Sequence, residues 1–60
     1  MQLGQQIMIA RKNKNLSQKE LGKLIGMSDM QISNIERGKN TPHLNNLKKI
    51  SEALGVKFEI

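Results

Sequence analysis

The chain has 60 residues, enough for one small domain. Its net charge of +5 fits a polyanion such as nucleic acid as partner, and the alternative is a small protein that stays soluble by being charged. It contains no Cys and one His, so a disulfide or a thiolate metal site is excluded, and we expect no catalytic residue, no metal and no cofactor. No apolar run reaches the ~20 residues that span a bilayer, and the start MQLGQQ lacks the basic residues of a secretory signal, so we expect a cytoplasmic protein without a membrane partner.

The first predicted helix covers residues 3–13. Leu3 and Ile7 recur at helical spacing, and Arg11 lies on the same stripe. The last turn is basic, which suits the negative end of the helix dipole. Asn15 follows, and asparagine is one of the residue types that adopt the left-handed conformation ending many helices.

Two capping boxes predict two further short helices. In a capping box, a Ser hydroxyl accepts from a backbone N–H three residues on, and a Glu or Gln side chain accepts from the N–H of the Ser. The two boxes are Ser17 with Glu20 and Ser28 with Gln31, and apolar residues at helical spacing follow each. We therefore expect one helix after the first box and a second over residues 28–37.

Glycine occupies two positions around the junction of these helices. Gly26 can adopt a positive φ and turn the chain sharply. Gly22 lies inside the first of the two helices, where the missing Cβ indicates that the second helix crosses close by. A short helix, a glycine turn and a second short helix form a helix-turn-helix.

The stretch from residue 17 to residue 38 resembles the helix-turn-helix of the phage-repressor family, which includes the lambda repressor, Cro and XRE-type regulators. With the flanking helices, the resemblance covers roughly residues 3–55. It implies an all-α fold, a compact bundle of four short helices with a central helix-turn-helix that binds double-stranded DNA. The residues that carry the resemblance are Gln18, Glu20, Leu21, Gly22, Gly26, Ile32, Ile35, Glu36 and Gly38.

The fourth predicted helix runs from about residue 43 to residue 54, after a polar and basic loop. Thr41 is the expected N-cap, and Pro42 suits the first turn. His43 lacks a second His or a Cys that could complete a metal site, so we expect it at a surface or cap position. The expected aliphatic core comprises Ile7, Ala10, Leu16, Leu21, Leu24, Ile25, Met27, Ile32, Ile35, Leu44, Leu47, Ile50 and Leu54.

Residues 56–60 alternate apolar and charged side chains, which is the pattern of a β-strand with one buried face. We expect a domain over residues 1–55 followed by this short C-terminal strand. A lone strand has unpaired backbone edges, so it must pair with a second copy, pair with a different protein or fold back without a sheet. We favour a homodimer joined by Val56, Phe58 and Ile60, and the alternative is a monomer in which Phe58 fills the end of its own core.

The resemblance also implies which residues contact DNA. The second helix of the motif lies with its N-terminal part in the major groove, which implies base contacts by Ser28, Asp29, Met30 and Asn34. Asn34 can pair with adenine, and Met30 can contact a thymine methyl group. The alternative for Met30 is a core position, but Ile32 and Ile35 already occupy the inward positions, so we favour an exposed Met30. Asp29 has two interpretations, as a cytosine contact and as an acid that the helix dipole favours in the first turn. The implied phosphate contacts come from Gln18, Ser33, Arg37, Lys39 and Asn40.

A structural brace is implied in the same way, in which Arg11 of the first helix pairs with Glu36 at the end of the recognition helix. The alternative is a solvated charge at a helix end. We favour the pair because both residue types stand at the positions that the resemblance requires. Removing one partner of such a buried pair strands the other charge.

Two functions fit these observations. The first is a sequence-specific DNA-binding transcriptional regulator, a repressor that acts as a homodimer. The alternative is an antitoxin that binds a toxin protein and represses its own operon, because HipB-like antitoxins share this fold and end in a short dimerising strand. The sequence contains no separate toxin-binding tail, which favours the first function.

Overall fold

The structure is a computed structural model that describes residues 2–58. Within this range the chain forms four helices and no strand: α1 (Leu3–Asn13), α2 (Gln18–Ile25), α3 (Asp29–Glu36) and α4 (Leu44–Leu54). The predicted all-α bundle of four short helices is therefore confirmed.

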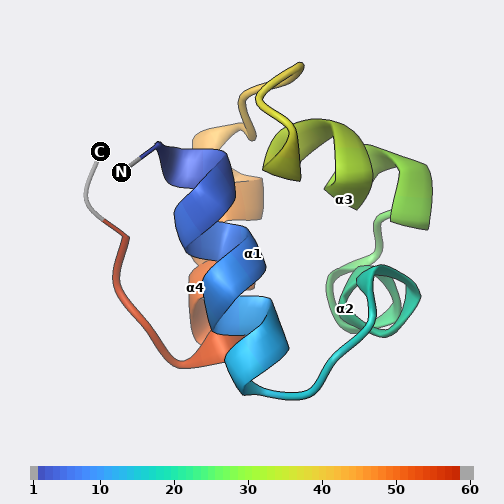
Figure 1. Cartoon of the computed structure of the whole chain (residues 1–60), viewed down its shortest axis with the longest axis vertical. Coiled ribbons are helices and arrows are strands. Elements are labelled where there is room, and N and C mark those ends of the chain that lie inside the picture. The colour runs from blue at the N-terminus through green and yellow to red at the C-terminus, as the bar shows by residue number, and fades with distance from the viewer. Residues whose placement is uncertain (1, 59–60) are drawn as a thin grey trace.

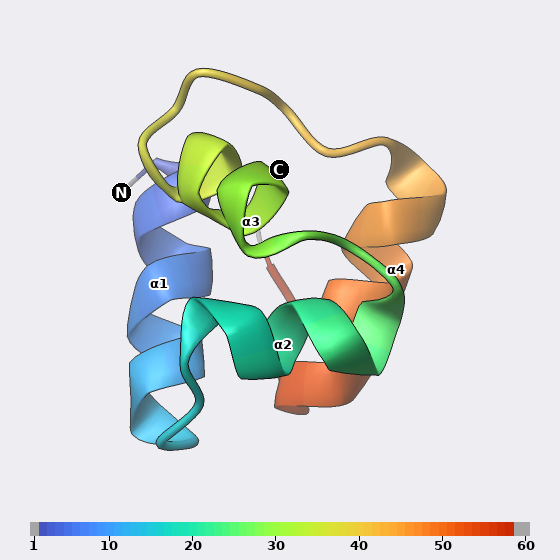
Figure 2. The same cartoon turned by 90° about the vertical axis from the view of Figure 1, so that its right-hand side faces the viewer.

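The helices surround one core, with α2 and α3 packed against each other and both α1 and α2 packed against α4 (Figure 1). α1 and α4 lie side by side, and α3 lies at the edge of the molecule above α2 (Figure 2). Residues 55–58 run along the side opposite to α2 and α3 (Figure 1). The helix-turn-helix therefore presents its second helix at an outer face.

The core is aliphatic, as the composition predicted. The buried hydrophobic residues are Ile7, Leu21, Ile25, Ile32, Ile35, Leu47, Ile50 and Leu54. Leu24 and Leu44, which we expected in the core, are instead 62% and 63% exposed. The buried face of α2 is centred on Leu21, Gly22 and Ile25, because Gly22 packs against the turn before α3. With Gly22 facing inward, the side chain of Leu24 points to the outside of the helix.

Local capping determines where the helix-turn-helix begins and turns. The hydroxyl oxygens of Ser17 and Ser28 accept from the N–H groups of Glu20 and Gln31 at 3.0 and 3.1 Å, and both return bonds form at 2.8 Å. Gly26 adopts φ +75° and closes α2 in the left-handed conformation. Three short-range signals therefore set both helix starts and the turn between them.

The start of α4 differs from the prediction. We expected Thr41 as the N-cap and Pro42 in the first turn, whereas the helix begins at Leu44 and His43 is the N-cap residue. His43 has an extended backbone with ψ 157° and makes no side-chain cap bond. Residues 41–43 therefore form a connection ahead of the helix.

The strand that we expected over residues 56–60 is absent from its described part, residues 56–58, while Ile60 lies outside the described residues. The Val56 N–H donates to the Ser51 carbonyl at 3.2 Å, and the Ser51 hydroxyl donates to the Val56 carbonyl. Phe58 is half-buried against the core. The backbone N–H and C=O groups of a strand need hydrogen-bond partners on a second strand. Residues 2–58 contain no such strand, so Val56 bonds to Ser51 at the end of α4 instead.

Candidate nucleic-acid interface

The start of α3 is a free polar surface on an otherwise packed helix. Ile32 and Ile35 face the core, with exposed fractions of 0% and 4%. Ser28 and Asp29 are exposed, and the Met30 side chain is 63% exposed. Because the inner face is already occupied by the isoleucines, this methionine is available for a ligand surface.

The Asp29 carboxylate is engaged locally. Its Oδ1 accepts from the Met30 N–H at 2.8 Å, within the first turn of α3. An acid there is favoured by the partial positive charge of the helix N-terminus. Asp29 is exposed, so the same residue combines the capping interpretation with a carboxylate at the surface of α3.

Asn34 lies in the middle of α3 and joins the helix to the loop that follows. Its Oδ1 accepts from Arg37 Nη2 at 3.2 Å, which fixes the oxygen side of the amide because a guanidinium can only donate. Its carbonyl accepts from the N–H groups of Lys39 and Asn40 at 2.9 and 3.3 Å. The pairing of Asn34 with Arg37 was not predicted from the sequence, although their spacing of three residues places them on one helix face.

The side chain of Gln18 reaches into the structure and contacts the end of α3. Its Nε2 donates to Glu36 Oε1 at 3.1 Å, so the amide has a second N–H left for another acceptor. Ser33 is half-buried, whereas Lys39 and Asn40 are exposed in the loop after α3. The residues expected to contact phosphate thus frame α3 on two sides.

A buried polar network holds α1, α2 and α3 together. Arg11 Nε donates to Glu36 Oε2 at 2.6 Å, and Nη2 donates to Glu36 Oε1 at 3.0 Å. The third nitrogen, Nη1, donates to the Leu16 carbonyl at 2.7 Å, a partner that the sequence did not indicate. The hydrogen bond that Arg11 donates to Glu36 raises the pKa of Arg11 above its ordinary value, so the guanidinium stays charged.

Among residues 2–58, no group of three or more His, Cys, Asp and Glu side chains could hold a metal ion. No described helix has both the length and the apolar character needed to cross a bilayer. The exposed face of α3 and the net charge of +5 are the features that bear on a nucleic-acid partner.

Comparison with known proteins yields relatives along nearly the whole chain. A family model described as helix-turn-helix matches residues 7–60. The repressor protein C2 of Salmonella phage P22 is 38% identical over 52 residues, which are 87% of this chain and 24% of that repressor. The chain therefore spans about a quarter of the length of this curated relative.

Solved structures agree with the sequence relatives. The P22 c2 repressor in complex with a synthetic operator is similar with a TM-score of 0.88 and 38% identity, over 95% of this chain and 88% of that one. SinR, a master regulator for biofilm formation solved in complex with DNA, is similar with a TM-score of 0.86 and 37% identity, over 93% of this chain and 90% of that one.

Proposed function

The chain belongs to the phage-repressor-like, XRE-type helix-turn-helix family, and from this premise we propose that it is a sequence-specific, double-stranded DNA-binding repressor of transcription. The observation that carries the proposal is the free face of α3, exposed at Ser28, Asp29 and Met30 while the opposite face is buried. The net charge of +5 supports attraction to the phosphate backbone. A helix displayed in this way can enter a major groove.

In the proposed complex, the exposed face of α3 reads base edges. Met30 contacts a thymine methyl group, and Ser28 and Asp29 bond to neighbouring bases. Asn34 pairs with adenine, and the bond from Arg37 at 3.2 Å supports this role because it holds the amide in one orientation. Each good bidentate pair is worth about 1–3 kcal/mol of discrimination.

Phosphate contacts frame this helix and fix its register on the duplex. Lys39 and Asn40 are exposed in a loop whose backbone is tied to Asn34, so contacts there hold α3 in place. Gln18 uses one N–H for Glu36 and offers the other to a phosphate, and Ser33 and Arg37 complete the frame. The cytoplasm or nucleoid is where such a regulator meets DNA.

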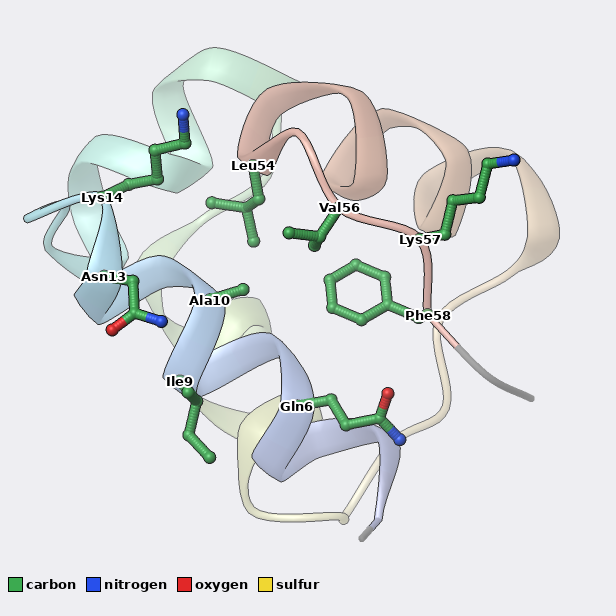
Figure 3. A pocket seen from close by; sticks show the side chains of 9 residues that line it. All are labelled: Gln6, Ile9, Ala10, Asn13, Lys14, Leu54, Val56, Lys57 and Phe58. Atoms are coloured by element: carbon green, nitrogen blue, oxygen red, sulfur yellow. The ribbon is translucent and has the colours of Figure 1, made fainter.

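We propose further that the protein acts as a homodimer, although without the intermolecular strand that we first expected. Support comes from exposed apolar side chains near the tail. Ile9 and Val56 line a hollow with Phe58 (Figure 3), and Leu44 lines a second hollow that Phe58 shares. Burial against a second copy would contribute about 1.5–3 kcal/mol per side chain before the costs of association. Two-fold symmetry would set the recognition helices about 34 Å apart and require a near-palindromic site.

The antitoxin alternative stays a prediction from the family resemblance. None of the interactions described for residues 2–58 favours a toxin as partner over a second copy of the chain. The discriminating observation is whether the neighbouring gene encodes a toxin.

Selection of bound sites from random duplex DNA tests the proposed function. We expect enrichment of one near-palindromic sequence with half-sites about one helical turn apart. A variant with Met30→Ala and Asn34→Ala keeps the buried face of α3 and serves as the control for base reading. Recovery of random sequences by the unaltered protein would overturn the proposal.

A further inference from the structure

A glycine outside the helix-turn-helix lies against the last turn of α3. Gly4 is buried in the first turn of α1. A Cβ built at this position would lie 2.4 Å from the carbonyl oxygen of Ile35 and 2.6 Å from that of Glu36. Both oxygens belong to the backbone of α3, so rotating a side chain cannot make room for the added Cβ.

The opposite end of α3 is held by a contact of the same kind. A Cβ at Gly22 would lie 2.2 Å from the Met27 carbonyl oxygen, in the turn that leads into α3. α1 and α2 therefore approach the two ends of the helix backbone to backbone. The Arg11–Glu36 pair crosses the same joint as Gly4, so the end of α3 cannot move away from α1 without straining those hydrogen bonds.

We propose that Gly4 is a positioning residue for DNA reading, which determines the tilt of α3 although it lies on another helix. The inference rests on the proposed function. A methyl group at this position needs about 1 Å of additional separation to reach ordinary van der Waals distance. With the other end fixed at Gly22, this displacement tilts a helix about 12 Å long. The shift is largest at the end of α3, so it changes how Asn34 meets the bases, while Ser28 and Met30 lie beside the fixed end.

Helix propensity does not account for a glycine at this position. Alanine is the better helix former, so Gly4→Ala would stabilise α1 if nothing lay against it. The exposed neighbour Gln5 provides the matched control, because Gln5→Ala places a better helix former on the same turn without facing α3. The close approach of two backbones is what requires glycine.

The test compares the unaltered protein, Gly4→Ala and Gln5→Ala on the sequence obtained by site selection and on a scrambled duplex of equal length. Fluorescence anisotropy at one salt concentration gives the ratio of the two affinities, at a temperature where circular dichroism shows all three proteins folded. If Gly4→Ala unfolds in buffer, all three are measured in trimethylamine oxide, which favours the folded state. Backbone amide NMR shifts report whether residues 35–40 move.

We expect Gly4→Ala to lose on the order of ten-fold in the affinity ratio, with the scrambled duplex bound about as before and the amides of residues 35–40 shifted. Gln5→Ala should match the unaltered protein in both measurements. If the affinity ratio of Gly4→Ala is the same as that of the unaltered protein, the inference is overturned, whether or not the variant is more stable. In that case α1, and not α3, has moved to make room for the methyl group. Failure of the proposed function would appear differently, as equal affinities of the unaltered protein for both duplexes.

Discussion

Arg11 and Glu36 meet across the joint between α1 and α3, through two hydrogen bonds of 2.6 and 3.0 Å between side chains that are 9% and 3% exposed. Arg11 also bonds the Leu16 carbonyl, and Glu36 also accepts from Gln18. The pair therefore joins the first helix, the connection to α2 and the end of the proposed recognition helix. Because Gln18 is also a proposed phosphate contact, the network links the core to the proposed DNA-binding surface.

Arg11→Met is expected to destabilise the fold by about 3–5 kcal/mol, because it leaves the Glu36 carboxylate buried without its cation. Combining it with Glu36→Leu should recover much of that loss, since neither charge is then stranded. Urea unfolding of the single and double variants measures the coupling. Additive effects in this cycle would show that the two side chains do not act as a pair.

The two capping boxes are expected to respond differently to acid. The backbone N–H of Ser17 donates to the Glu20 carboxylate, and this bond is the largest cause that lowers the pKa of Glu20, followed by the Ser17 hydroxyl. The second box uses the uncharged Gln31. The stabilisation from Glu20 should be fully present above the ordinary pKa of the carboxyl and disappear as the pH falls through the lowered value. In thermal melts, Glu20→Gln should therefore lose less stability on acidification than the unaltered protein. An identical dependence of the melting temperature on pH for the variant and the unaltered protein would contradict the prediction.

DNA binding is expected to weaken steeply with salt. Each phosphate neutralised should contribute a slope of about −0.9 to the logarithm of the binding constant against the logarithm of salt concentration. Lys39→Ala should reduce the magnitude of this slope by about 0.9, the contribution of one phosphate contact, and weaken binding to all sequences alike. Lys12→Ala, in the last turn of α1, should leave the slope unchanged. Affinity that stays flat between low and high salt would exclude the proposed phosphate contacts.

Asn34→Ala is expected to cost about 1–3 kcal/mol on the selected site and to relax preference at one base pair. Arg37→Ala should reproduce part of this effect, since Arg37 holds the Asn34 amide. Asn45→Ala, an exposed asparagine of α4, is the matched control. Titration against single-base variants of the site provides the measurement, and an unaltered base preference in Asn34→Ala would remove this residue from the reading surface.

A chain that ends at Gly55 is expected to dimerise less than the full chain, because it lacks Val56 and Phe58 beside the apolar hollow (Figure 3). It should also unfold at lower urea concentration, since Phe58 packs against the core. Sedimentation at micromolar concentration measures dimerisation apart from stability, with Lys19→Ala, an exposed residue of α2, as the control. A full chain that is monomeric there, or a dimer that survives the truncation unchanged, would refute the proposed interface.

The sequence by itself determined the helices of the helix-turn-helix, because their signals are short-range. Ser17 and Ser28 cap helices through residues three positions away, and Gly26 turns the chain by its own backbone freedom. The exposed position of Met30 followed from the occupation of the inner face by isoleucines. The family resemblance added the pairing of Arg11 with Glu36, which lie 25 residues apart and have no local signal.

Only the tertiary structure decided the features that depend on which surfaces meet. Leu24 fits the helical pattern of α2 but lies outside the core, because the approach of Gly22 to the turn rotates the buried face. The alternating pattern of the tail predicts a strand, but strand formation requires a partner edge, and the described tail bonds to Ser51 at the end of α4 instead. The contact of Gly4 with the end of α3 is equally invisible in the sequence, because a close approach of two backbones depends on how distant helices cross and on no local pattern.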